Sequence, residues 1–342
     1  MIAWMRKLIV TLVADYQNGM QRFLTIGETS DEQDALSISI TGTKYLSPMK
    51  DEFAISIKNI PVESDKVSML QIKDTNFKYI TIEAGYEENS EIVFNGYIVY
   101  ISSKLEDNGK TVNVSIVCSG SYTFNSLHGK TYTIRKGTTY RTALLSAARV
   151  SGIHESQISL SSTLLYKRLQ KDTTYDGSLM SMIIELQNQD KNLLCHCDFT
   201  SKSKFQVWDA TLQGTRELKM NTNNIMLTNG FPTIEDQGIR FTCLPILNLI
   251  PGDEIIISED SFINRSIDSL SSYMSTPYPD VFVGAVSPLE TDPEKIKEIE
   301  AVKGHYIIKE LRYKLENRGH AFEMTVKCYA KSLYKALSQN WN

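Results

Sequence analysis

The sequence lacks an excess of positive charge. Its 342 residues include 36 Lys and Arg against 40 Asp and Glu, which gives a net charge of −4. Proteins that bind nucleic acid neutralise its phosphates with a basic surface, and this composition supplies no broad basic field. We therefore expect no nucleic-acid recognition.

Long hydrophobic runs are also missing. No stretch approaches the length that is needed to span a bilayer. The apolar run at residues 8–14 is at the short limit for the core of a signal peptide, and Asp15-Tyr16-Gln17 offers no small-residue cleavage site. We expect this run to be an opening strand, and the protein to be soluble and made in a cytoplasm.

Motifs for catalysis and cofactor binding are scarce. The 18 glycines fall singly and never cluster ahead of a helix, so the sequence has no phosphate-binding loop. The five histidines lie outside Gly-x-Ser-x-Gly and His-Glu-x-x-His patterns, and we expect them on surfaces or in turns. Forty acidic residues can always include a glycosidase pair, but candidates such as Glu185 and Asp253 have plain roles on a helix face and in a turn. We predict no catalytic residue and no cofactor.

The five cysteines are an odd number and are widely scattered, which is typical of reduced thiols that fill a core. Cys195-His196-Cys197 is the one cluster that looks like metal ligands. In a strand, both sulfurs would lie on one face and the imidazole on the other, so the three could not converge on one ion. No second close pair of Cys or His supplies further ligands. Cys195 and Cys197 are therefore only weak metal candidates, and we predict no metal site.

What the sequence does have is β-structure. The part up to about residue 127 is rich in Ile, Val, Tyr and Phe, in short runs that are separated by Gly, Asn, Asp and Pro. Seven strands are predicted, at residues 8–14, 22–27, 35–41, 52–57, 79–84, 93–103 and 110–118. This number and spacing indicate a barrel or a sandwich.

The middle part, residues 129–214, has a different character. Apolar residues recur at helical spacing after Thr138 or Thr139 up to Gly152, and again after Asp176 or Ser178. The second stripe comprises Leu179, Met182, Ile183 and Leu186. Residues 193–199 and 204–209 then read as a strand pair. We predict a small α+β insert.

Strands return after residue 215. They are predicted at 224–228, 238–244, 254–258, 306–315 and 321–329, followed by a terminal helix from about 330 to 339. Pro251-Gly252-Asp253 is a turn, because Pro fixes φ and Gly accepts a positive φ. Residues 258–304 form an irregular insertion with four prolines and a serine-rich run, which is typical of a functional loop or of a segment that orders on binding.

The strongest pattern is a β-hairpin that occurs twice, at an offset of 210 positions. Residues 97–118 read YIVYISSKLEDNGKTVNVSIVC, and residues 307–328 read IIKELRYKLENRGHAFEMTVKC. The positions that agree are Lys104 with Lys314, Leu105 with Leu315, Glu106 with Glu316, Gly109 with Gly319 and Cys118 with Cys328. Either the chain carries two related β-domains, or two ordinary hairpins share their turn chemistry.

Each copy alternates as a strand with one buried face does. In the second copy the predicted wet residues include Glu310, Arg312, Lys314 and Glu316, and Gly319 is expected to take a positive φ in the turn. The predicted inner residues of the two return strands are Val112, Val114, Ile116 and Cys118, and Phe322, Met324, Val326 and Cys328.

The order of these parts resembles a known family, the baseplate hub proteins of contractile-tail bacteriophages, and the related amino-terminal hub region of type VI secretion spikes. The resemblance rests on GIRFTCLPILNLIPGDEIIIS, followed after an insertion by GHYIIKELRYKLENRGHAFEMTVKC, and on the two helices of the middle part. It implies a mainly β fold with two related tube-like β-barrel domains around an α+β middle domain. The domains would be residues 1–128, 129–214 and 215–342.

The resemblance also implies a function without a reaction. Three copies would form a homotrimer whose six barrels adapt the hexameric tail tube to a trimeric central spike, in the baseplate of a virion assembled in the host cytoplasm. Other baseplate proteins would be further partners, and the insertion at 258–304 is predicted to contact one of them or the tube. Individual interface residues are not predicted. Two alternatives stay open: a tail-tip or distal tail protein of a non-contractile phage, and a cell-wall glycan hydrolase or carbohydrate-binding β-protein.

Overall fold

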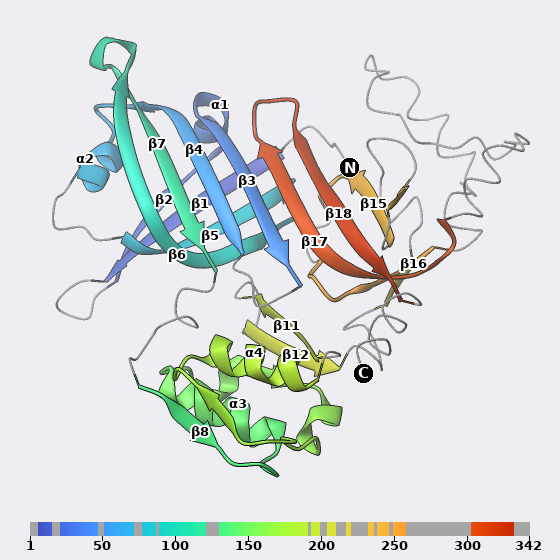
Figure 1. Cartoon of the computed structure of the whole chain (residues 1–342). Coiled ribbons are helices and arrows are strands. Elements are labelled where there is room, and N and C mark those ends of the chain that lie inside the picture. Colours follow the sequence, from blue (N-terminus) through green and yellow to red (C-terminus); the bar gives the residue numbers. More distant parts are fainter. Residues whose placement is uncertain are drawn as a thin grey trace, which may run out of the picture. The chain divides into compact units, whose positions relative to one another are not determined.

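The structure is a computed structural model, and it consists of two compact units (Figure 1). Unit 1 comprises Met1–Ala210 and Tyr313–Phe322, and unit 2 comprises Thr211–Arg312 and Glu323–Asn342. The domain boundaries at residues 128 and 214 stay a prediction. The structure describes residues 6–15, 21–46, 51–71, 77–86, 89–120, 130–190, 193–198, 204–209, 217–219, 232–235, 238–245, 249–257 and 302–331.

All seven strands predicted for the first part are confirmed. They are β1 (Arg6–Asp15), β2 (Gln21–Ile26), β3 (Ser37–Tyr45), β4 (Glu52–Pro61), β5 (Phe77–Tyr86), β6 (Asn89–Glu106) and β7 (Thr111–Ser119). They pair antiparallel in the order β2–β1–β5–β6–β7–β4–β3, and the sheet is strongly curved (Figure 1). Two short helices that the sequence analysis missed, α1 (Ser30–Ala35) and α2 (Asp65–Gln71), and a 3₁₀ turn at Asp107–Gly109 connect them.

One face of this sheet forms the core of unit 1. Ile40, Ile55 and Ile116 lie opposite one another on β3, β4 and β7, and all three are buried. The predicted inner residues of β7 are buried as well. Branched and aromatic side chains at every second position bury most of their apolar area against the same interior, and this burial is the main stabilising term of such a sheet.

The predicted α+β insert is confirmed. Its elements are β8 (Tyr132–Ile134), α3 (Tyr140–Val150), a 3₁₀ turn (Glu155–Gln157), β9 (Ile158–Leu160), a second 3₁₀ turn (Ser162–Leu165), β10 (Thr173–Tyr175), α4 (Leu179–Gln189), β11 (Leu193–Asp198) and β12 (Lys204–Asp209). Thr139 and Ser178 are the N-caps of the two helices, and each hydroxyl accepts a bond from a backbone N–H three residues on. The predicted stripe on α4 is buried against α3, β11 and β12.

The remaining strands are β13 (Glu217–Lys219), β14 (Thr233–Glu235), β15 (Gly238–Cys243), β16 (Glu254–Ile257), β17 (Gly304–Glu316) and β18 (Phe322–Ala330). They lie in unit 2, except that the hairpin tip Tyr313–Phe322 belongs to unit 1. Gly252 has the positive φ, 100°, that the Pro-Gly-Asp turn requires. The predicted strand at 224–228, residues 258–301 of the insertion and residues 332–342 of the terminal helix lie outside the described residues. The mainly β fold class is confirmed.

The hairpin repeat extends to five strands. In what we call the first set, the order is β3–β4–β7–β6–β5, and in the second set it is β14–β15–β18–β17–β16. All neighbours in the first set pair antiparallel, and so do β14 with β15, β15 with β18 and β16 with β17 in the second set. Two unrelated hairpins would not share this order, so the sets are two versions of one supersecondary structure.

The offset of 210 also holds for the pairing at the turn of the hairpin, and equivalent hairpin residues meet equivalent strands on both flanks. Cys118 pairs with Phe53 on β4, and Cys328 pairs with Ile239 on β15. On the other flank Tyr97 pairs with Tyr79 on β5, and Ile307 pairs with Glu254 on β16. At the turns, Glu106 pairs with Thr111, and Glu316 N–H donates to Ala321 O at 2.7 Å.

Two expectations for the second hairpin were wrong. Glu310 is buried, although alternation placed it on the wet face, because Arg312 and Lys327 lie beside it and pair with its carboxylate. Gly319 does not take a positive φ, whereas its counterpart Gly109 does, at 86°. A Cβ at Gly319 would instead overlap the side chain of Glu316, so the close approach of Glu316 is what favours glycine at this position.

Candidate interaction surfaces

The tip of the β17–β18 hairpin belongs to unit 1 and is fastened there by one asparagine. Asn317 Oδ1 accepts a hydrogen bond from Ile38 N at 2.8 Å, and Asn317 Nδ2 donates to Gln33 O at 3.0 Å and to Leu36 O at 3.1 Å. The backbone N–H of Asn317 donates to Ile38 O at 3.1 Å. An aspartate, which has no donor, could not make this set of bonds.

Arg6 holds the same tip from β1. Its guanidinium donates to Gly319 O at 2.6 Å and lies 5.3 Å from the centroid of the Phe322 ring. That ring in turn packs on Tyr86, with 5.4 Å between centroids. The Arg6 guanidinium thus makes a hydrogen bond and a cation–π contact at the same time, and the two together fix its orientation. We call Tyr313–Phe322, with these partners on β1, β3, β5 and α1, the tip dock.

The tip runs along β3 in the antiparallel sense. Asn317 lies at Ile38, near the beginning of β3, whereas Tyr313 packs on Phe53 with 5.7 Å between the ring centroids. Phe53 is the β4 partner of Gly42, four residues further along β3. Leu315, between these two points, is 0% exposed. The dock therefore adds the end of β17 to the edge of the first set.

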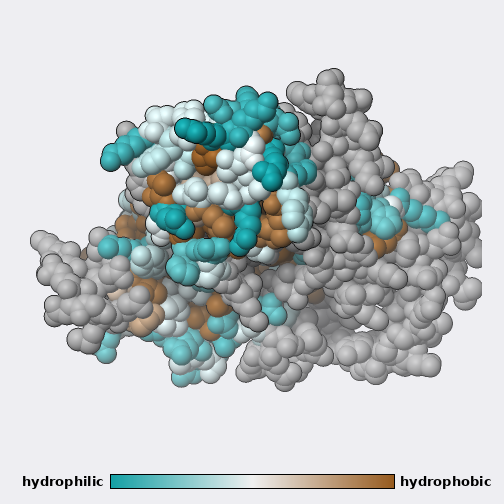
Figure 2. All heavy atoms as spheres, turned by 90° about the horizontal axis from the view of Figure 1, so that it is seen from below, coloured by the Kyte–Doolittle hydropathy of each residue, from teal (hydrophilic) through white to brown (hydrophobic). Residues whose placement is uncertain are grey.

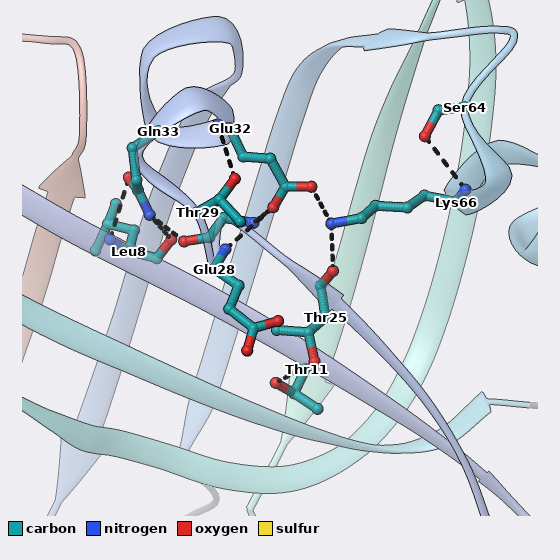
Figure 3. A network of polar contacts seen from close by, with 10 residues as sticks. Leu8, Thr11, Thr25, Glu28, Thr29, Glu32, Gln33, Ser64 and Lys66 are labelled. Carbon is teal, nitrogen blue, oxygen red and sulfur yellow. Dashed lines mark hydrogen bonds and ion pairs between the residues drawn. The ribbon is translucent and has the colours of Figure 1, made fainter.

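Helix α1 is held in place for this contact by the polar network of Figure 3. Gln33 Nε2 donates to Leu8 O at 2.7 Å, and the Glu32 carboxylate accepts from Gly27 N at 3.0 Å and from Lys66 on α2. Burial by itself raises the pKa of Glu32, but the bonds from Lys66 and from the backbone outweigh it, so the pKa is lowered from its usual value. The network connects α1 to β1 and α2.

The outer face of the first set, opposite the core, carries small hydroxyl residues. Ser39, Ser56, Ser115 and Ser102 lie side by side across β3, β4, β7 and β6. The adjacent row consists of Thr41, Ala54, Val117 and Tyr100, and all four are exposed. Neither row contains a charge, so no ionised group has to be desolvated when this face is covered.

The outer face of the second set is charged at the equivalent positions. Lys327 replaces Val117, Arg312 replaces Ser102, and Arg240 on β15 pairs with Lys327. Around them is a pocket of about 290 Å³ that is lined by Thr233, Arg240, Phe241, Thr242, Arg312, Thr325 and Lys327. Glu235 and Glu310 pair with these cations. The two sets have therefore kept one backbone and diverged in surface chemistry.

Solved structures share this architecture. A type VI secretion component of Escherichia coli, described as structurally similar to the T4 bacteriophage tail proteins gp27 and gp5, gives a TM-score of 0.52 at 9% identity, with 86% of this chain and 73% of that chain covered. The 43 kDa tail protein of prophage MuSo2 from Shewanella oneidensis gives 0.51 at 8% identity, over 96% of this chain and 98% of that chain. No protein-family model and no curated protein matches the sequence.

The chain has a phage baseplate hub-like fold. At identities this low the likeness concerns the fold alone. In the described part of the face shown in Figure 2, hydrophobic residues form separate islands among hydrophilic ones, without one continuous apolar belt.

The residues singled out for chemistry in the sequence do not converge within the described part of this hub-like fold. Cys195 and Cys197 lie on β11, opposite Val207 and Phe205, and Cys195 is buried. Burial raises the pKa of the Cys195 thiol to about 12. Among the residues that the structure describes, no group of three or more Cys, His, Asp and Glu could hold a metal ion. His154, His305 and His320 are exposed, as predicted.

Asp253 also has the structural role that was predicted for it. It is buried in its turn, where its carboxylate accepts a bond from Ile250 N at 3.1 Å. None of the helices within the described ranges is both long and apolar enough to cross a membrane.

The sequence analysis missed the tip dock. Arg6, Gln33 and Asn317 were not singled out there. One local signal was available for α1: Thr29 and Glu32 form the Ser/Thr-x-x-Glu pattern of a helix N-terminus, and Thr29 Oγ1 does accept from Glu32 N at 3.3 Å. The partners of Arg6 and Asn317 are about 280 to 313 positions away in the sequence, and no local pattern encodes such a contact.

Proposed function

We propose that this chain is the structural hub of a phage tail baseplate, with no reaction of its own. Three copies form a homotrimer that adapts the hexameric tail tube to a trimeric central spike. The observation that carries the proposal is the duplication: the first and second sets repeat five strands in the same order, with equivalent hairpin residues paired to equivalent strands.

Duplication supports this role through symmetry. A trimer can match a sixfold ring only if each of its subunits presents two equivalent surfaces. Each of the six subunits of the ring then contacts the same backbone structure. The hub-like fold, seen in a tail protein and in a secretion component, supports the same role. The partners would be the tail tube hexamer, the central spike and other baseplate proteins, in the tail of the assembled virion.

The mass of the purified full chain tests the proposal. We expect a species of three times the mass of one chain, and a larger complex when the tail tube protein of the same phage is added. Obligate interfaces of this kind bury on the order of 2,000 to 5,000 Å², so we expect the trimer to persist when the chain is diluted. A monomer at all concentrations, or hydrolysis of purified peptidoglycan that a single carboxylate substitution abolishes, would contradict the proposal.

A further inference from the structure

Strand β6 has an unpaired edge over half of its length. Its pairing with β5 ends at Tyr97, so from Ile98 to Glu106 it has only β7 as a neighbour among the described strands. The turn after it, Asp107–Gly109, is exposed and projects past the neighbouring strands in Figure 1. A bare strand edge of this length is a template for pairing with another chain.

Strand β14 also presents a free edge. It is the last strand in its sheet order, with β15 on one side and no other described strand on the opposite side. All three of its residues are exposed, and the side chain of Ile234 is 58% exposed.

The chain itself contains the pairing that these two edges lack. The end of β17 is equivalent to the end of β6, and β3 is equivalent to β14. Within unit 1 the end of β17 lies on the edge of β3, where the tip dock holds it. The β17–β3 contact is therefore formed within the chain, whereas the equivalent contact, between β6 and β14, is not formed among the described strands.

One pair of leucines records the difference. Leu315 and Leu105 occupy the same position of the repeated hairpin, yet Leu315 is 0% exposed and Leu105 is 58% exposed. Val99 and Tyr100, on the same half of β6, are exposed as well. Apolar side chains that gather along a bare strand edge favour a protein partner over water.

We propose that β6 of one copy pairs antiparallel with β14 of a second copy and so repeats the tip dock between chains. This rests on the proposed trimer, and it names the surfaces that hold the trimer together. The contact is head to tail, because the two edges differ. Repeated three times, it closes a ring in which docks within chains alternate with docks between chains.

Equivalence also identifies which residues should meet. Tyr313 packs on the β4 partner of Gly42. Its counterpart in the first hairpin is Ser103, and the counterpart of Gly42 on β14 is Ile234, which pairs with Ile239 as Gly42 pairs with Phe53. Ser103 of one copy should therefore lie close to Ile234 of the next.

The test uses the full chain with two edge variants, Leu105→Asp and Ile234→Asp. Ile184→Asp, at an exposed apolar position of α4, is the matched control. If the proposal holds, each edge variant weakens self-association at least tenfold by sedimentation velocity, while the control stays trimeric. An equimolar mixture of the two edge variants should form heterodimers, because each still has one intact edge. Unfolding of a variant could not produce that complementation.

Disulfide trapping gives an independent readout. A chain with Ser103→Cys and Ile234→Cys should form covalent dimers and trimers on mild oxidation, and a chain with Ser103→Cys and Ile184→Cys should not. If the wild type is trimeric but the edge variants stay trimeric and the cysteines do not couple, the edge pairing is wrong and the hub function survives. If the wild type is monomeric throughout, both are wrong.

Discussion

Asn317→Ala should destabilise unit 1 by more than is usual for a turn residue. The side chain makes bonds to Ile38 N, Gln33 O, Leu36 O and Gln33 Oε1. A hydrogen bond contributes about 0.5–1.5 kcal/mol net, and these groups are partly buried, so we expect a loss of about 2–3 kcal/mol. For a cooperative unit of this size, each kcal/mol lowers Tm by about 2–4 °C.

The repeat supplies the matched control. Asp107 occupies the equivalent position of the first hairpin, where it is exposed and has a φ of 51°. Asp107→Ala should cost no more than about 1 kcal/mol, because it removes only the tolerance of Asp for the left-handed region. Asn317→Asp should cost at least as much as Asn317→Ala, since it brings a carboxylate against two carbonyl oxygens.

Thermal unfolding of the full chain measures the loss, and hydrogen exchange locates it. The Ile38 amide donates to Asn317 Oδ1 and should lose protection in Asn317→Ala but not in Asp107→Ala. Equal stability of the two alanine variants, with unchanged exchange at Ile38, would refute the tip dock as a stabilising contact.

Three further predictions concern the first unit and the thiols. Gly42→Ala should cost about 2–3 kcal/mol by urea unfolding, because its Cβ would overlap the ring of Phe53. Gly109 lies in open space but has a φ of 86°, so Gly109→Ala should cost about 1 kcal/mol. Equal costs for the two variants would contradict this prediction. The lowered pKa of Glu32 stabilises the fold above its usual value of 4.5, and the effect is lost as pH falls through the lower folded value. Glu32→Gln should therefore lower stability slightly at pH 7, by about 0.5 kcal/mol, and by less as the medium becomes more acidic than pH 4.5. The buried thiols of Cys118, Cys195, Cys243 and Cys328 have raised pKa values and should stay unreactive toward a disulfide reagent at pH 8 until the chain unfolds. Because the chain has five cysteines, fast labelling of more than one thiol in the native chain would contradict this burial.

The strands were predictable because burial on one face imposes a period of two on the residues themselves. It is clearest on β7 and in the second hairpin from Leu311 onward, whereas the outer half of β6 lacks it, since Val99, Tyr100 and Leu105 are all exposed. The same rule failed at Glu310, where two neighbouring cations allow a carboxylate to be buried. Helices α1 and α2 were missed because six or seven residues are too few for a helical period to appear.

The extent of the repeat could not be read from the sequence. The hairpins share turn residues, but their flanking strands share only alternation: EFAISIKNIP on β4 and GIRFTC on β15 have no common motif. What is conserved between them is strand order and register, and these become visible only when the pairing partners are known. The tip dock was hidden for the same reason, because its residues come from opposite ends of the chain.

In the proposed trimer, the divergence of the two outer faces matters as much as the likeness of their backbones. A partner with sixfold symmetry makes equal contacts at every step only where the two sets agree, which means backbone and strand edges. A partner with threefold symmetry can use what differs, such as Lys327 where the first set has Val117. Duplication followed by divergence at Lys327 and Arg312 therefore gives one ring two kinds of surface, one shared by all six sets and one repeated three times.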